Sequence, residues 1–239
     1  EGIEIEGQPF DLVQYCLKGP PELKNHTLTV YEQPLIFVCS LALWEMMNPQ
    51  ADAVLALSFG EWTAVVVVGC LDFKAGLLAA LKRGELTAKA GGSSLLLTAL
   101  PKLKIGKIRR FCKLAGDLWL TNINSPYQGV LAGRIRNPDG LIAALQKHFP
   151  EMRVRPFDIG GAFHSPLMEE ARCQLKDYLE EVNFQSPRIP IICNATGEAE
   201  TDPKKIKKLL LRQTAARLDL RKTARKLPDG TILQEICLP

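Results

Sequence analysis

The chain has 239 residues, of which 46% are hydrophobic and 23% charged, and its net charge is only +4. This balance is typical of a folded globular protein and excludes disorder over the whole chain, while the lack of any run of about 20 apolar residues excludes a membrane-spanning helix. Three histidines and seven scattered cysteines without a CxxC pair predict reduced thiols and no metal site.

The N-terminal stretch is acidic, whereas secretory and transit peptides are basic at this position. We therefore expect a soluble, cytoplasmic protein. Because the chain starts at Glu1 rather than at methionine, the sequence also predicts a processed or excised piece. Domains commonly have about 100 to 200 residues, so the length allows one large domain or two smaller ones.

The first half of the chain combines helical periodicity with one short buried strand. Apolar residues three and four positions apart predict helices over 10–17, 34–47 and 72–90. Residues 52–57, DAVLAL, predict a strand that is apolar throughout and is followed at once by a helical pattern. Such a strand is typical of a parallel sheet covered on both faces, so this part of the chain is predicted to be α/β.

Residues 92–159 have a different pattern, bounded by glycine pairs at 91–92 and 160–161. In chain order they predict β, α, β, β, α and β segments, with Asn137 as the N-cap of the second helix. This order is the ferredoxin-like arrangement, so we predict an inserted small subdomain at 92–159. The six predicted segments are 94–100, 105–115, 118–123, 129–133, 137–149 and 152–158.

After this insertion the chain is predicted to return to the larger subdomain, formed by 1–91 and 160–239. Residues 165–182 predict an amphipathic helix, 190–196 a strand, and 202–218 a further helix.

A basic run lies near the end of the chain. Residues 204–226 carry ten basic side chains and one acidic side chain, Asp219. Two interpretations stay open: a solvated helix face, or a surface for an anionic partner such as a phosphorylated cofactor or an acidic carrier protein. Nucleic acid is the least favoured partner, because no binding motif or aromatic-basic interleaving accompanies the run.

Ser58 lies in the polar break A-L-S-F-G-E-W, where the predicted strand gives way to a helix. The pattern resembles the nucleophile elbow G-x-S-x-G, in which small residues flank a sharp turn that lifts the serine above the sheet edge. Ala56 replaces the first glycine. A serine at a strand–helix junction is also a common helix N-cap, so both interpretations stay open.

A serine nucleophile needs a base to take its proton. His26 lies in a polar loop and His148 at the end of a helix, whereas His164 lies in the glycine-rich loop G-G-A-F-H-S before an amphipathic helix. Arg83 comes 25 residues after Ser58. Its side chain either extends to solvent or points inward, where the guanidinium offers bidentate recognition of a carboxylate.

Taken together, these motifs resemble one family. S-F-G-E-W-T-A, followed by V-G-C-L-D-F and K-R-G-E, resembles the G-H-S-L-G-E-Y-S-A core of malonyl-CoA:acyl carrier protein transacylases and of the acyltransferase domains of fatty acid and polyketide synthases. N-S-P-Y-Q-G-V-L-A-G, G-A-F-H-S-P-L-M, I-C-N-A-T-G and L-L-L-R-Q resemble later family segments in collinear order, and the likeness runs from about Phe10 to Pro239. It implies an α/β fold with a parallel-sheet, α/β-hydrolase-like large subdomain and a ferredoxin-like small subdomain.

The resemblance implies a ping-pong transfer of a malonyl group from coenzyme A to the phosphopantetheine thiol of an acyl carrier protein, in fatty acid or polyketide biosynthesis. The protein would act alone or within a larger synthase. Ser58 would be the nucleophile and His164 the base and then the acid, while Arg83 would hold the free carboxylate of the malonyl group. The backbone N–H of Phe59 would be an oxyanion donor. Malonyl-CoA is the implied substrate, and no cofactor, metal, nucleic acid or membrane is expected.

Four further site residues follow from the same resemblance. Gln213 matches the helix glutamine near a main-chain carbonyl that orients the histidine. Phe163 would crowd the carbon between the two carbonyls and so favour malonyl over methylmalonyl. Asn124 and Gln128, from the Asn-x-x-x-Gln hairpin, are expected to bind substrate.

Departures from the family pattern bear on activity. The family's Gly-Gln-Gly loop, which gives a second oxyanion donor, has no counterpart here, and Leu57 stands where a histidine usually precedes the nucleophile. We also expect the family's first strand and C-terminal helix to be missing. Loss of one oxyanion donor lowers kcat by about 10²–10³-fold, so the activity is expected to be weakened.

Two other functions are compatible with parts of the sequence. The first is a catalytically impaired acyltransferase-fold module that docks an acyl carrier protein. The second is a serine hydrolase of the α/β-hydrolase type, which is disfavoured because that fold places its histidine near the end of the chain and no histidine follows His164.

Overall fold

The computed structural model describes residues 3–5, 8–18, 28–100, 102–234 and 236, so the predicted loop around His26 lies outside the described residues. The first elements in chain order are β1 (Ile3–Ile5), β2 (Gln8–Phe10), α1 (Leu12–Lys18), α2 (Leu28–Met47), β3 (Val54–Leu55), α3 (Gly60–Val67), α4 (Phe73–Ala90), β4 (Ser93–Ala99), α5 (Ile105–Ala115) and β5 (Leu118–Ile123). They are followed by β6 (Gln128–Gly133), α6 (Pro138–His148), β7 (Met152–Phe157), the 3-10 turn η1 (Pro166–Met168), α7 (Glu169–Glu180), β8 (Ile191–Cys193), β9 (Glu198–Glu200), α8 (Pro203–Ala215), β10 (Leu218–Asp219) and α9 (Leu220–Ala224). In this part of the chain no helix is both long and apolar enough to cross a bilayer.

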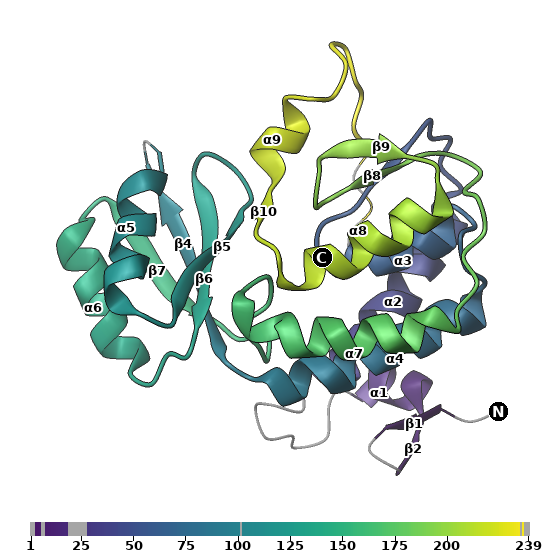
Figure 1. The fold of residues 1–239 in the computed structure, drawn as a ribbon, viewed down its shortest axis with the longest axis horizontal. Helices are drawn as coiled ribbons and strands as arrows, with labels where there is room; N and C mark the ends of the chain where they lie inside the picture. The colour runs from purple at the N-terminus through teal and green to yellow at the C-terminus, as the bar shows by residue number, and fades with distance from the viewer. Residues whose placement is uncertain (1–2, 6–7, 19–27, 101, 235, 237–239) are drawn as a thin grey trace.

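The small sheet has the strand order β10-β5-β6-β4-β7, with β4, β5, β6 and β7 paired antiparallel. The four consecutive strands β5-β6-β4-β7 follow the ferredoxin-like order, as predicted. Residues at every second position of β4, namely Leu95, Leu97 and Ala99, are buried against α5 and α6. Figure 1 shows these two helices on the side of the sheet that faces away from α7 and α8.

One strand of this sheet was not predicted. β10 comes from the end of the chain and pairs in parallel with β5, Leu218 lying opposite Asn122. The predicted helix over 202–218 therefore ends at Ala215. The proposed boundaries of the insertion, 92 and 159, stay a prediction, but the sheet itself includes this later strand.

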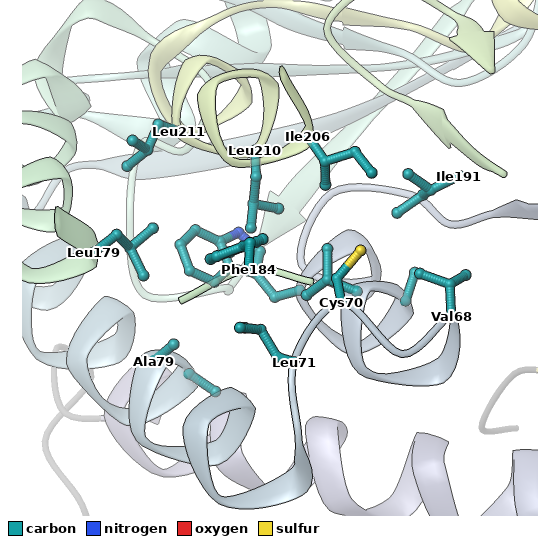
Figure 2. Close-up of a cluster of buried hydrophobic side chains, with 14 of the residues drawn as sticks. Val68, Cys70, Leu71, Ala79, Leu179, Phe184, Ile191, Ile206, Leu210 and Leu211 are labelled. Carbon is teal, nitrogen blue, oxygen red and sulfur yellow. The ribbon is translucent and has the colours of Figure 1, made fainter. Parts of the chain in front are cut away.

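The larger part of the molecule contains a parallel pair of strands, as the apolar segment 52–57 led us to expect. β3 pairs in parallel with β8, and β9 adds an antiparallel strand. The predicted strand over 52–57 is reduced to Val54–Leu55, because the chain turns immediately into the segment that bears Ser58. Figure 2 shows the buried cluster that packs α3, α4, α7 and α8 together, with Ala79, Leu179, Phe184 and Leu210 among its members.

Helix α2 begins six residues earlier than predicted, at Leu28, and therefore contains Pro34. A proline inside a helix removes one backbone hydrogen bond. Packing against α4 outweighs this loss, because Gly84 lets the first turn of α2 come close: a Cβ at Gly84 would lie 3.2 Å from the Cα of Val30 and 3.3 Å from the carbonyl oxygen of Thr29. This close approach brings the start of α2 against the part of α4 that carries Arg83.

Candidate active site

Ser58 lies on a sharp turn between β3 and α3. Its φ is 56°, in the left-handed region that residues other than glycine seldom adopt. A Cβ at Gly60 would lie only 3.2 Å from the Cβ of Ala56, so both flanking positions must be small. Alanine therefore serves in place of the first glycine. The N-cap interpretation is wrong, because the N-cap of α3 is Phe59, with no side-chain cap hydrogen bond.

The hydroxyl of Ser58 lies within hydrogen-bond distance of His164 rather than capping α3. Its Oγ lies 2.6 Å from Nε2 of His164, and Nδ1 of the same ring lies 2.6 Å from the carbonyl oxygen of Gln213. A carbonyl oxygen only accepts, so Nδ1 carries the ring hydrogen and donates it. Nε2 of the neutral ring therefore presents its lone pair to the Ser58 hydroxyl. Residues 106 positions apart are thus joined in the geometry that a serine nucleophile and its base require.

His164 is held in its neutral form by its surroundings. The side chain is 3% exposed, and burial lowers its pKa from 6.5 to about 3. The hydrogen bond to the Gln213 carbonyl opposes this shift, and the positive charge of Arg83 adds to it. The imidazole is therefore neutral at neutral pH, with the unprotonated Nε2 facing the Ser58 hydroxyl.

Gln213 connects both members of this pair. Its backbone carbonyl accepts from His164, while its side-chain Nε2 donates to the backbone oxygen of Ser58 at 2.9 Å. The neighbouring carbonyl, of Thr214, accepts the backbone N–H of His164 at 3.1 Å. The C-terminal turn of α8 thus fixes the relative position of Ser58 and His164.

Arg83 points inward and is only 1% exposed, so the alternative in which it extends to solvent is wrong. Its guanidinium carbon lies 5.4, 5.7 and 5.3 Å from the ring centroids of Phe59, Trp62 and Phe163. Nη1 donates to Oε1 of Gln33 at 2.7 Å, whereas Nε and Nη2 have no acceptor among the described residues. Burial lowers the pKa of Arg83 to about 9.

A buried cation with two free donors is costly unless an anion binds to it. The aromatic rings around Arg83 exclude water from this place, and two of them belong to Phe59 and Phe163, which adjoin Ser58 and His164 in the chain. Gln33, which sequence reasoning missed, is fixed by the hydroxyls of Thr29 and Thr87, at 2.8 and 3.1 Å. The arrangement can hold a carboxylate beside the Ser58 hydroxyl.

Two other residues near Ser58 were also missed. Asn194 follows β8, and its side chain accepts the backbone N–H of Ser58 at 2.7 Å. Glu61 is 1% exposed, and its Oε1 accepts the backbone N–H of Asn194 at 3.2 Å. Glu61 lies in the motif S-F-G-E and Asn194 in the motif I-C-N-A-T-G, both noted in the sequence. The motifs do not indicate which backbone groups these two side chains bind.

The ionisation of Glu61 gives a stability prediction. Burial raises its pKa from 4.5 to about 8, against the opposing hydrogen bonds from Asn194 and Cys193. The stability that the protonated carboxyl contributes is therefore full below pH 4.5 and is lost as the pH rises to about 8. Glu61→Gln keeps an acceptor and does not ionise, so we expect its melting temperature to exceed that of the wild type at pH 8 and to fall less between pH 6.5 and pH 8. Thermal unfolding followed by circular dichroism measures this.

The matched control is Glu45→Gln, on the exposed surface of α2, which is expected to melt like the wild type over the same range. His164 acts in the opposite sense, because its lowered pKa removes stability as the pH falls from 6.5 towards 3, below the range used. An identical pH dependence in Glu61→Gln and the wild type would contradict the burial of an ionisable carboxyl.

The remaining predicted site residues have different positions. The backbone N–H of Phe59 has no acceptor among the described residues and is free to serve as an oxyanion donor. Asn124 Nδ2 donates to Gln128 Oε1 at 2.9 Å, so these two side chains close the β5–β6 turn. No hydrogen bond between described residues joins them to Ser58, His164 or Arg83, and their role in substrate binding stays a prediction.

The basic run of 204–226 is less uniform than the sequence suggested. Lys207 donates to the carbonyls of Leu179 and Val182, both at 2.7 Å, and so caps the end of α7. Three more cations form ion pairs: Lys205 with Glu200, Arg221 with Asp219 and Lys226 with Glu198. Only part of the run, including the exposed Lys204 and Lys208, is therefore available to an anionic partner.

Known proteins that are similar to this chain include several malonyl-CoA-acyl carrier protein transacylases. No protein-family model matches the chain. The mitochondrial malonyl-CoA-acyl carrier protein transacylase of Mus musculus is 30% identical over 227 residues, covering 87% of this chain and 58% of that protein. The chain thus spans less than two thirds of the length of this relative.

Solved structures that are similar to this chain include malonyl transferases. The crystal structure of an acyl carrier protein S-malonyltransferase from Vibrio cholerae is similar with a TM-score of 0.78 at 29% identity, covering 91% of this chain and 72% of that chain. A malonyl-transacylase in complex with its type II polyketide synthase acyl-carrier protein has a TM-score of 0.79 at 26% identity, covering 90% of this chain and 72% of that chain.

Proposed function

This chain belongs to the malonyl-CoA:acyl carrier protein transacylase family, and from that premise we propose that it transfers a malonyl group from coenzyme A to the phosphopantetheine thiol of an acyl carrier protein. The observation that carries the proposal is the Ser58–His164 pair, 2.6 Å apart, beside a buried arginine with two free donors. The partner is supported by the similar malonyl-transacylase that was solved with its acyl-carrier protein.

In the first half-reaction the Ser58 Oγ attacks the thioester carbonyl carbon of malonyl-CoA while its proton passes to Nε2 of His164. The backbone N–H of Phe59 donates to the oxyanion of the tetrahedral intermediate. The carbon–sulfur bond then breaks, and the leaving thiolate of coenzyme A takes the proton from His164. Malonyl-Ser58 remains.

In the second half-reaction the phosphopantetheine thiol gives its proton to His164 and attacks the acyl-serine carbonyl. The carbon–oxygen bond breaks, and Oγ of Ser58 recovers the proton. Arg83 binds the malonyl carboxylate through its free Nε and Nη2 donors throughout, which places the reacting carbonyl against Ser58. Phe163, whose ring packs on Arg83, narrows the space around the central carbon of the malonyl group.

The proposed reaction also has implications for cofactor, pathway and cellular location. No cofactor is required beyond the coenzyme A thioester itself, and the product supplies fatty acid or polyketide synthesis. We propose a cytoplasmic location, although the mouse relative is mitochondrial. The alternative of an impaired docking module is less favoured, because Ser58 and His164 lie within hydrogen-bond distance and the buried Arg83 keeps two donors unpaired among the described residues.

Intact-mass analysis tests the proposal. Incubation with malonyl-CoA is expected to add one malonyl group to the protein, and addition of an acyl carrier protein bearing phosphopantetheine is expected to remove it. Acetyl-CoA should label the protein far more slowly, because an acetyl group leaves the buried Arg83 without a carboxylate. Absence of any adduct, with carrier binding intact, would favour the docking module instead.

A further inference from the structure

Asn194 is placed to control the backbone on both sides of the nucleophile. It directly follows β8, the parallel neighbour of β3, so its side chain reaches the turn that follows β3. Oδ1 accepts the backbone N–H of Ser58 at 2.7 Å, and Nδ2 donates to the carbonyl of Ala56 at 2.5 Å. One amide thus holds two backbone groups of the elbow, 136 and 138 residues away in the chain.

The elbow needs such support because its conformation is unfavourable on its own. Ser58 has φ 56°, and a left-handed serine persists only where the surroundings fix it. The direction in which Oγ points depends on this backbone conformation. Without the two bonds to Asn194, the bond from the Gln213 side chain to the Ser58 carbonyl would remain as a distant support, and we expect the turn to relax and the hydroxyl to move away from Nε2 of His164.

Asn194 is itself anchored by a buried acid. Oε1 of Glu61, in the first turn of α3, accepts the backbone N–H of Asn194 at 3.2 Å. Asn194 is 7% exposed and Glu61 is 1% exposed, so water does not compete for these bonds. The chain of contacts runs from Glu61 through Asn194 to Ser58, and it joins the two strand ends at the elbow.

We propose that Asn194, anchored by Glu61, is a positioning residue that sets the backbone of Ser58 and so aims its hydroxyl at His164. Because Asn194 takes up the N–H of Ser58, the neighbouring N–H of Phe59 is the one left free for the oxyanion. The inference rests on the proposed function for the identity of the acyl group, but it concerns the activation of Ser58 with any electrophile.

The test measures two reactions of Ser58 in the full chain. One is steady-state malonyl transfer, which separates kcat from KM, and the other is labelling by a fluorophosphonate, which reports an activated serine without needing malonyl-CoA. Asn194→Ala is expected to lower both kcat and the labelling rate by about 100-fold, because a displacement of about 1 Å costs this much. KM for malonyl-CoA is expected to stay within about twofold, since uniform substrate binding is not touched.

Asn137→Ala is the matched control. Asn137 is also an asparagine that holds backbone, accepting the N–H of Gly140 at 2.9 Å as the N-cap of α6, but it lies in the small subdomain. Its loss is expected to lower the melting temperature by about 2–4 °C while kcat and labelling stay unchanged. If Asn194→Ala does not fold, Asn194→Asp replaces it in the test. This variant keeps an oxygen that accepts from Ser58 but loses the donor to Ala56. We expect both kcat and the labelling rate to fall by about tenfold or more.

Labelling of the Asn194 variants at the wild-type rate would overturn the proposal, and so would an equal fall in Asn137→Ala or a change confined to KM. If the wild type reacts with the fluorophosphonate but never with malonyl-CoA, the proposed function fails while the labelling comparison still decides the role of Asn194.

Discussion

Ser58→Ala is expected to lower malonyl transfer by about 10⁶-fold, because removal of the nucleophile of a serine enzyme costs this much even when every other group stays in place. No acyl adduct should form. The fold should be unaffected, since Oγ makes its hydrogen bond to His164 and does not cap α3. Intact-mass analysis after incubation with malonyl-CoA, together with a transfer assay, measures both effects.

Ser93→Ala controls for the substitution itself. Ser93 is exposed at the start of β4, and its variant should acquire the malonyl group like the wild type. A malonyl adduct that persists in Ser58→Ala would show that another side chain is acylated, and the assignment of the nucleophile would then be wrong.

Arg83→Gln is expected to lower kcat/KM for malonyl-CoA by about 10²–10³-fold, the effect of losing one partner of a buried, charge-assisted pair. Acetyl transfer should not fall, because the acetyl group has no carboxylate to bind. The preference between the two substrates should therefore collapse or reverse. Competition between malonyl-CoA and acetyl-CoA, read as the ratio of the two adducts on Ser58, measures this directly.

The free protein offers a second readout of the same change. Arg83 is buried with two donors that have no acceptor among the described residues, so an empty site keeps a poorly compensated charge. We expect Arg83→Gln to raise the melting temperature of the unliganded protein. Arg83→Lys keeps the charge but loses the bidentate guanidinium geometry. Its preference for malonyl-CoA over acetyl-CoA should therefore lie between those of the wild type and Arg83→Gln. An unchanged malonyl-to-acetyl ratio in Arg83→Gln would refute its role.

The sequence was sufficient for the parts of the site that lie within motifs. Ser58 and His164 each stand in a local pattern that predicts a turn or a loop, and the structure brings them to 2.6 Å. The small sheet was predicted for the same reason, since its strands and helices alternate with clear periodicity. Arg83 was singled out, but whether it pointed inward depended on the packing of α2 against α4.

What the sequence did not predict depends on contacts between distant segments. Asn194 binds the elbow only because β8 lies beside β3, and no local pattern states which strands are neighbours. In the sequence Lys207 is one of several cations in a basic run, whereas in the structure it donates to carbonyls at the end of α7. β10 is too short to show periodicity, and its pairing with β5 is set by where α8 ends.

The hydrogen-bond acceptor of His164 Nδ1 is a main-chain atom, the carbonyl oxygen of Gln213, and this determines which mutations the site tolerates. Every amino acid has a carbonyl oxygen, so no replacement at position 213 deletes the group that orients His164; it removes only the side-chain bond from Gln213 to Ser58. The position of this carbonyl depends instead on the register of α8. One residue inserted between Asp202 and Gln213 turns the rest of the helix by about 100° and carries this carbonyl away from the ring. The orientation of His164 is therefore insensitive to the identity of residue 213 but sensitive to a change in the length of α8.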